Sequence, residues 1–249
     1  TQEFAIAFSD DPLDEIKGTK WEDVNGNGVR NNTFNNPIEL INNSSQGYYN
    51  ESLGDLYPGD PDHPLAEYFP EPNSFKGATN FAIAPDLSQI NHLGSWLSNP
   101  SDALNNSFWS KPQSIPYSWN INDETAIIYE VDAGLTGINN LKGNFGVDNS
   151  IFVWVNGEYK FGATAQGEAV PDEYANIDLG NLAPGKNYIQ ILRADFGVIN
   201  GYDIKITGNK NSFIEPGLAG ITVYLDRNNN GLLDTNEPTQ ITASDNPNT

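Results

Sequence analysis

Short β-branched and aromatic runs, each bounded by Asn, Gly, Pro or Asp, recur along most of this 249-residue chain. The clearest runs are residues 126–132, 150–155, 158–162, 187–192, 202–207 and 220–225. Runs of this length between turn residues are typical of β-strands, and the frequent turn residues leave little room for long helices. Their spacing favours a β-sandwich over an alternation of strands and helices. We therefore expect an all-β protein.

Three segments depart from this pattern. Residues 87–96 and 101–108 are candidate helical stretches without a long periodicity, so each is expected to form one or two turns. Residues 32–72 are rich in Asn, Pro and Asp and poor in strand-forming runs, so we expect long ordered loops there.

The charge and the cysteine count exclude several classes of function. The chain has 33 Asp and Glu against 12 Lys and Arg, a formal net charge of −21, and it has no cysteine. Such an acidic surface repels nucleic-acid phosphates and anionic lipid. The lack of cysteine excludes disulfides, thiol nucleophiles and cysteine-based metal sites. Because no apolar run approaches the roughly 18 residues of a membrane span, we expect no membrane insertion of this chain.

The strongest chemical signal is the segment Asp226 to Glu237, DRNNNGLLDTNE. Calcium takes about six to eight oxygen ligands, and this spacing places oxygen-bearing groups at loop positions 1, 3, 5, 7, 9 and 12, with Gly231 at the sharp turn. The predicted calcium ligands are Asp226, Asn228, Asn230, the Leu232 carbonyl, Asp234 and Glu237. The alternative interpretation is an Asn-rich hairpin turn.

A second, incomplete copy of this loop begins at Asp23 with the sequence DVNGNGVRN. Its predicted ligands are Asp23, Asn25, Asn27, the Val29 carbonyl and Asn31. Position 12 is Phe34, which cannot bind an ion. Glu215 stands later in the chain, in a segment that leads directly into the loop Asp226 to Glu237.

The two ends of the chain resemble the SdrD B-like (serine-aspartate repeat B-like) domain of bacterial surface proteins. The matching residues are 18–30, GTKWEDVNGNGVR, and 215–226, EPGLAGITVYLD. In that family the two segments are contiguous, so the resemblance implies a domain insertion, with Glu215 as the displaced position-12 ligand. It also implies two or more Ca²⁺ ions, an extracellular location on the bacterial surface or in secreted form, and neighbouring modules in the same chain. The calcium loops of dockerins and EF-hands lead into helices instead, which Pro216 and Pro238 disfavour here.

This resemblance predicts two domains. Residues 1–31 and 213–249 would form a partial immunoglobulin-like B-type β-sandwich that is incomplete at its C-terminal end. Residues 32–212 would form the inserted domain, whose strand pattern around 144–208 is similar to jelly-roll and galactose-binding-like modules of PA14 and fibro-slime type. In PA14-type lectins an Asp-rich turn at the place of Asp148 and Asn149 holds calcium, whereas a capped tight turn would explain the same two residues.

An aromatic and acidic tract in the inserted domain is a second candidate for ligand binding. It is expected to be exposed, and its candidate residues are Tyr48, Tyr49, Tyr57, Asp60 and Asp62. Aromatic rings stack on sugars while carboxylates meet hydroxyl groups, so the tract is a candidate for a surface glycan or a peptide. Loop packing explains the same residues equally well.

Nothing in the sequence favours catalysis, because no nucleophile–histidine or metalloprotease pattern occurs. We therefore expect a protein that is not an enzyme. One hypothesis is an adhesin module that is stabilised by calcium and presents its inserted domain for carbohydrate or protein binding. The alternative is a structural stalk or spacer that calcium stiffens and that has no ligand.

Overall fold

The computed structural model describes residues 20–23, 36–56, 79–165, 167–195, 197–210 and 217–244. These residues belong to two compact units, one within residues 36–210 and the other made of 20–23 and 217–244. Nearly all regular structure in both units is strand, so the prediction of an all-β, sandwich-type protein is confirmed. The expected residues Asn25, Asn27, Val29, Asn31, Tyr57, Asp60, Asp62 and Glu215 lie outside the described residues.

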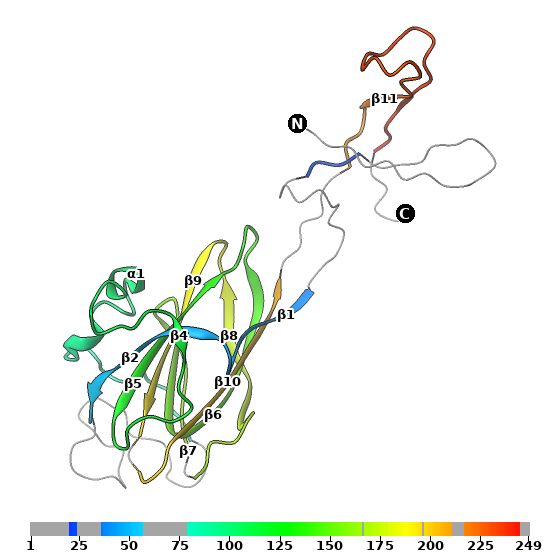
Figure 1. Ribbon diagram of the computed structural model, residues 1–249. Coiled ribbons are helices and arrows are strands. Elements are labelled where there is room, and N and C mark those ends of the chain that lie inside the picture. The colour runs from blue at the N-terminus through cyan, green and yellow to red at the C-terminus, as the bar shows by residue number, and fades with distance from the viewer. Residues whose placement is uncertain are drawn as a thin grey trace. The chain divides into compact units, whose positions relative to one another are not determined.

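The larger unit is an antiparallel sheet of ten strands that curls on itself (Figure 1). Its strands are β1 (Asn36–Asn42), β2 (Gln46–Gly54), β3 (Thr79–Asn80), β4 (Gln113–Ser114), β5 (Glu124–Asp132), β6 (Ile138–Val155), β7 (Glu158–Ala165), β8 (Tyr174–Leu182), β9 (Lys186–Ala194) and β10 (Gly201–Lys210). The main path through the sheet runs β1-β10-β6-β9-β5-β2-β4, while β7 and β8 also pair with β6, and β3 pairs with β7.

The long strand β6 connects the two halves of this sheet. Up to Asp148 it pairs with β10 and β8, and from Asn149 onward it pairs with β7 and β9. The strand therefore changes partners between Asp148 and Asn149. This change lets the sheet fold over its own apolar face and encloses a core.

Both faces of the second half of β6 are buried. Ile151, Val153 and their alternate neighbours face the core between the two halves of the sheet. Phe152 and Trp154 point to the opposite face, where residues 81–109 cover them with a second apolar cluster. In that cluster the ring of Trp96 lies edge-on to the ring of Trp154, with 5.4 Å between the ring centroids.

The segment that covers this face contains the only helical turns among the described residues. They are η1 (Asn91–Leu93) and α1 (Pro100–Ala103), each a single short turn, as the sequence predicts for residues 87–96 and 101–108. No helix in the described ranges is long and apolar enough to cross a membrane.

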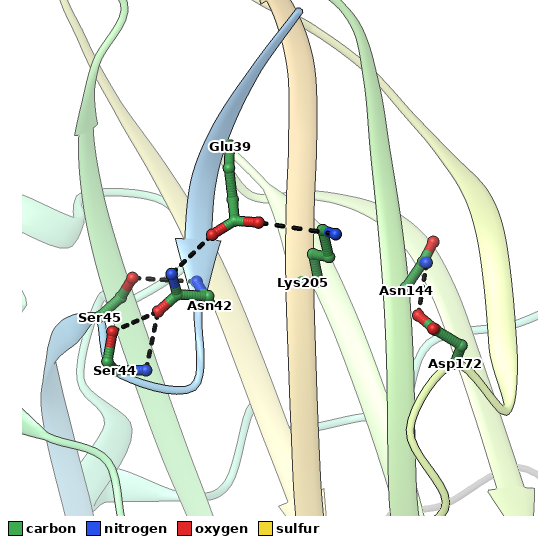
Figure 2. A network of polar contacts seen from close by, with 7 residues as sticks. All are labelled: Glu39, Asn42, Ser44, Ser45, Asn144, Asp172 and Lys205. Carbon is green, nitrogen blue, oxygen red and sulfur yellow. Dashed lines mark hydrogen bonds and ion pairs between the residues drawn. The ribbon is translucent and has the colours of Figure 1, made fainter.

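The expectation of long loops over residues 32–72 is wrong for two segments, because β1 and β2 are strands of the sheet, β1 paired with β10 and β2 with β4 and β5. Figure 2 shows how polar side chains close the turn: the Asn42 carboxamide oxygen accepts hydrogen bonds from the Ser44 backbone N–H and hydroxyl, at 2.8 and 2.6 Å. The Glu39 carboxylate accepts from Asn42 and pairs with Lys205 of β10 at 3.6 Å. The Asn-rich composition therefore marks a turn between two strands that pair with different partners.

In the smaller unit, β11 (Thr222–Tyr224) and β12 (Thr239–Ile241) form a two-stranded antiparallel ribbon. Trp21 and Gly217 form an antiparallel bridge, and the Leu218 N–H donates to the Lys20 carbonyl at 2.9 Å. Residues from the two ends of the chain thus lie side by side in this unit. Its assignment as an SdrD B-like domain stays a prediction.

Candidate functional site

The loop between β11 and β12 contains the six calcium ligands that the sequence predicts. At its start, the Asp226 carboxylate accepts hydrogen bonds from the backbone N–H groups of Asn230 and Gly231, at 3.2 and 2.7 Å. These bonds, above all the one from Gly231, lower the pKa of Asp226. The carboxylate is therefore ionised and held over the turn at Gly231, whose φ of 76° suits glycine.

Glu237 closes the loop from the other end. Its two carboxylate oxygens accept hydrogen bonds from the backbone N–H groups of Arg227 at 2.8 Å and Asp234 at 3.1 Å. Residues at positions 2, 9 and 12 of the loop are thereby tied together. The loop is therefore closed by hydrogen bonds, while the role of Glu237 as a bidentate calcium ligand stays a prediction.

Between these ends, the side chains of Asn228 and Asn230 converge on Asp234. Their amide nitrogens donate to one Asp234 carboxylate oxygen at 2.7 and 2.9 Å. Their amide oxygens accept from the backbone N–H groups of Asn230 at 3.1 Å and Leu232 at 2.7 Å. Each of these amide oxygens has a second lone pair, so it can bind a cation while it accepts a hydrogen bond. The loop therefore carries oxygen atoms of the number and type that calcium takes as ligands.

Of the other predicted loop, only Asp23 belongs to the described residues, where it is exposed. Within the described ranges, no three Asp, Glu or His side chains form a group that could hold a metal ion. Asp226, Asp234 and Glu237 are three such residues, so the structure does not bring their carboxylates together around one point. Both calcium sites stay predictions.

The second candidate site lies where β6 changes partners. Asp148 and Asn149 are buried there, the peptide bond between them is cis, and the Asn149 amide donates to the Asp148 carboxylate at 2.7 Å. Burial, together with the neighbouring charges of Asp195 and Glu173, raises the pKa of Asp148 to about 7. The structure therefore places several acidic groups around this point of the sheet.

Asp195, which the sequence did not single out, is fully buried beside this point, just after β9. One of its carboxylate oxygens accepts from the Asn122 backbone N–H at 2.7 Å, and no described residue donates to the other. Burial raises the pKa of Asp195. Asp148 and Asp195 are 47 positions apart in the sequence, so only the sheet brings them together.

The expected exposure of the aromatic tract is wrong for Tyr49. Tyr48 is half-buried against the outer apolar cluster, and Tyr49 is buried on the opposite face of β2. The Tyr49 hydroxyl accepts from the guanidinium of Arg193 at 3.3 Å. Adjacent residues of a strand point to opposite faces, so Tyr48 and Tyr49 cannot line one surface.

Arg193 of β9 is a fully buried cation held by aromatic rings. Its guanidinium carbon lies 4.1 Å from the ring centroid of Trp119 and 4.8 Å from that of Tyr202. It also donates to the Thr125 hydroxyl at 3.0 Å and to the Pro116 carbonyl at 2.8 Å. These contacts hold the guanidinium against the half-buried indole of Trp119.

Glu124, at the start of β5, is a fully buried acid. One carboxyl oxygen accepts from the Leu56 N–H at 2.5 Å, and the other has no partner among the described residues. Burial raises its pKa to about 9, with smaller contributions from Asp55, Asp123 and Asp195. At neutral pH this side chain is therefore a neutral carboxylic acid.

Comparison of the chain with protein-family models, with curated proteins and with solved structures finds no match.

Proposed function

We propose that this protein is a calcium-stabilised module of an extracellular bacterial surface protein, whose larger unit presents a carbohydrate-binding or protein-binding end. The observation that carries the proposal is the closed loop between Asp226 and Glu237. Both end carboxylates accept two hydrogen bonds from backbone N–H groups, and the side chains between them supply further oxygens. Backbone N–H groups hold these carboxylates in place before any ion binds, which reduces the entropy that binding must overcome.

Calcium would be held in this loop by the six groups that the sequence predicts. When bound, the ion neutralises the acidic groups and cross-links the two ends of the loop. Because the loop joins β11 directly to β12, binding would stabilise the pairing of these two strands. An acidic, cysteine-free chain would gain in this way a cross-link that disulfides supply to other secreted domains.

Terbium luminescence tests this proposal at the loop itself. The Tyr224 hydroxyl donates to the Gly231 carbonyl at 3.1 Å, so Tyr224 is close enough to sensitise a lanthanide bound in the loop. We expect saturable luminescence that calcium displaces, and a strong loss of it in Asp226→Ala and Glu237→Ala. Glu158→Ala, an exposed change in the larger unit, is the matched control. Equal luminescence in the control and in both loop variants would contradict the proposal.

Thermal unfolding tests the stabilising role. At a calcium concentration 100 times the dissociation constant, one site adds about 2.7 kcal/mol, and EDTA should remove this gain. Asp23→Ala should reduce the gain separately from Asp226→Ala if both loops bind calcium. Unfolding that is identical with calcium and with EDTA would contradict a calcium-stabilised module.

The presentation of a ligand is supported by the buried acids near the point where β6 changes partners. Asp148 and Asp195 are both buried near a change of strand partners, the charge of Asp195 raises the pKa of Asp148, and one Asp195 oxygen lacks a partner among the described residues. Proteins seldom keep such groups without a functional reason. A screen of immobilised glycans and peptides tests this part, with Asp148→Asn as the variant expected to lose binding. A screen with no binder, together with calcium-dependent unfolding, would favour the alternative of a structural spacer.

A further inference from the structure

A pocket of about 280 Å³ opens on the larger unit beside the end of β2 and the start of β5. Tyr49 and Trp119 supply its aromatic surface, and Glu51, Asp123, Asn120 and Thr125 are among its polar lining residues. Tyr49 and Thr125 are buried, whereas Glu51 and Asn120 are exposed. The aromatic and hydroxyl groups thus form the base of the pocket, and an acid and an amide form its rim.

The shape of this pocket is set from beneath by Arg193. The guanidinium lies over the Trp119 ring, donates to the hydroxyl groups of Tyr49 and Thr125, and is itself fully buried. The indole N–H of Trp119 donates to the Asp123 carbonyl at 2.7 Å, which fixes the ring from its edge. Tyr49, Thr125 and the Trp119 ring are therefore held in one arrangement before a ligand arrives.

The size of the pocket limits the ligand to a small one. Pockets for drug-sized molecules measure about 300–1,000 Å³, so this one suits a single ring of about a dozen heavy atoms. The half-buried Trp119 ring, with carboxylate, amide and hydroxyl groups near it, matches a ring that has an apolar face and several hydroxyl groups. The hydroxyl hydrogens of such a ring would donate to the carboxylates of Glu51 and Asp123, which can only accept when ionised.

The charges around the pocket favour a neutral ligand. Glu51 and Asp123 repel an anion, and no Lys or Arg is among the described residues that line the pocket. A cationic ligand would stack on rings against which the Arg193 guanidinium already lies, so two like charges would share the same aromatic side chains. Both effects disfavour charged ligands of either sign.

We infer that the pocket between Tyr49 and Trp119 binds one neutral sugar ring, as a terminal residue of a glycan. This inference rests on the ligand presentation proposed above and names the ligand class and the residues. Single sugar rings make few contacts, so we expect a dissociation constant on the order of 1 to 10 mM for a monosaccharide.

The test uses ¹H–¹⁵N NMR spectra of the whole chain. The probes are the methyl α- and β-glycosides of glucose, galactose and mannose, with tetramethylammonium as a cationic competitor. The indole N–H signal of Trp119, assigned by its loss in Trp119→Phe, reports directly on the pocket. We expect at least one glycoside to shift this signal saturably and tetramethylammonium to leave it unchanged.

Glu51→Ala should raise the dissociation constant of that glycoside about tenfold, which is the effect of losing one hydrogen bond to a charged group. Because Glu51 is exposed, this variant should fold normally; Glu130→Ala, an exposed change on β5, is the matched control. The inference is overturned if no glycoside shifts the Trp119 signal, if Glu51→Ala binds as well as the control, or if tetramethylammonium shifts it instead. If the glycan or peptide screen finds a binder but no glycoside shifts the Trp119 signal, only the assignment of this pocket is overturned. If the screen finds no binder and no glycoside shifts the signal, the proposed ligand presentation is overturned as well.

Discussion

The buried Glu124 makes a quantitative prediction about how stability depends on pH. Its pKa rises from 4.5 in the unfolded chain to about 9 in the folded protein, because burial penalises the charged carboxylate. Between these two values the folded protein keeps a proton that the unfolded chain has released. Stability from this group is therefore fully present below pH 4.5 and is lost as pH rises toward about 9.

The substitution Glu124→Gln removes this dependence, since glutamine is neutral at every pH. Each pKa unit corresponds to about 1.4 kcal/mol, so between pH 5 and pH 8 the wild-type protein should lose about 4 kcal/mol that the variant retains. The new amide can keep the hydrogen bond from the Leu56 N–H, but its N–H₂ group has no acceptor among the described residues, which costs about 1–3 kcal/mol at all pH values. The variant should thus be similar to or slightly less stable than wild type at pH 5, and more stable by about 2–4 kcal/mol at pH 8.

Urea unfolding at pH 5, 6, 7 and 8 in EDTA, followed by tryptophan fluorescence, measures this difference without a contribution from calcium. Contributions from other acids cancel when the variant is compared with wild type at each pH. Glu130→Gln, on the exposed part of the same strand, controls for the chemical change. A difference between Glu124→Gln and wild type that changes by less than about 1 kcal/mol from pH 5 to pH 8 would refute a neutral, buried Glu124.

Three further variants test the packing around the candidate sites, each by urea unfolding against wild type. Trp154→Ala should cost about 3–5 kcal/mol, because it leaves a cavity in the outer apolar cluster; a loss below 1 kcal/mol would mean that residues 81–109 do not cover this face. Arg193→Lys should cost about 2–4 kcal/mol, since lysine cannot reproduce the stacked, hydrogen-bonded guanidinium; an unchanged midpoint would contradict that role. Gly137→Ala should destabilise by over 1 kcal/mol, because φ is 76° and the new Cβ would lie 2.5 Å from the Leu182 carbonyl oxygen; a stabilised variant would contradict this backbone geometry.

Much of the local structure followed from residue order alone. The β-branched and aromatic runs became β5, the second half of β6, β7, β9 and β10, because turn residues limited each run to strand length. The twelve residues from Asp226 to Glu237 close on themselves through bonds within the loop, so their arrangement depends on spacing and little else. Strands β1 and β2 were missed because Asn42 and its neighbours are typical of a long loop as well as of a short turn. Pairing of β1 with β10 and of β2 with β5 decided between the two.

What the sequence determined by itself is therefore contact between near neighbours: strand periodicity, turns and the oxygen-rich loop. Only the tertiary structure decided which polar groups are buried together. Asp148 and Asp195 meet because β6 changes partners between the two halves of the sheet, and Tyr49, Trp119 and Arg193 meet across three separate segments. Periodicity shows which face of a strand is apolar, but it does not specify which distant residue lies opposite a given side chain, because that depends on the order and register of strands. Periodicity also did not determine that both faces of the second half of β6 are buried. The face that carries Phe152 and Trp154 is buried because residues 81–109 pack over it.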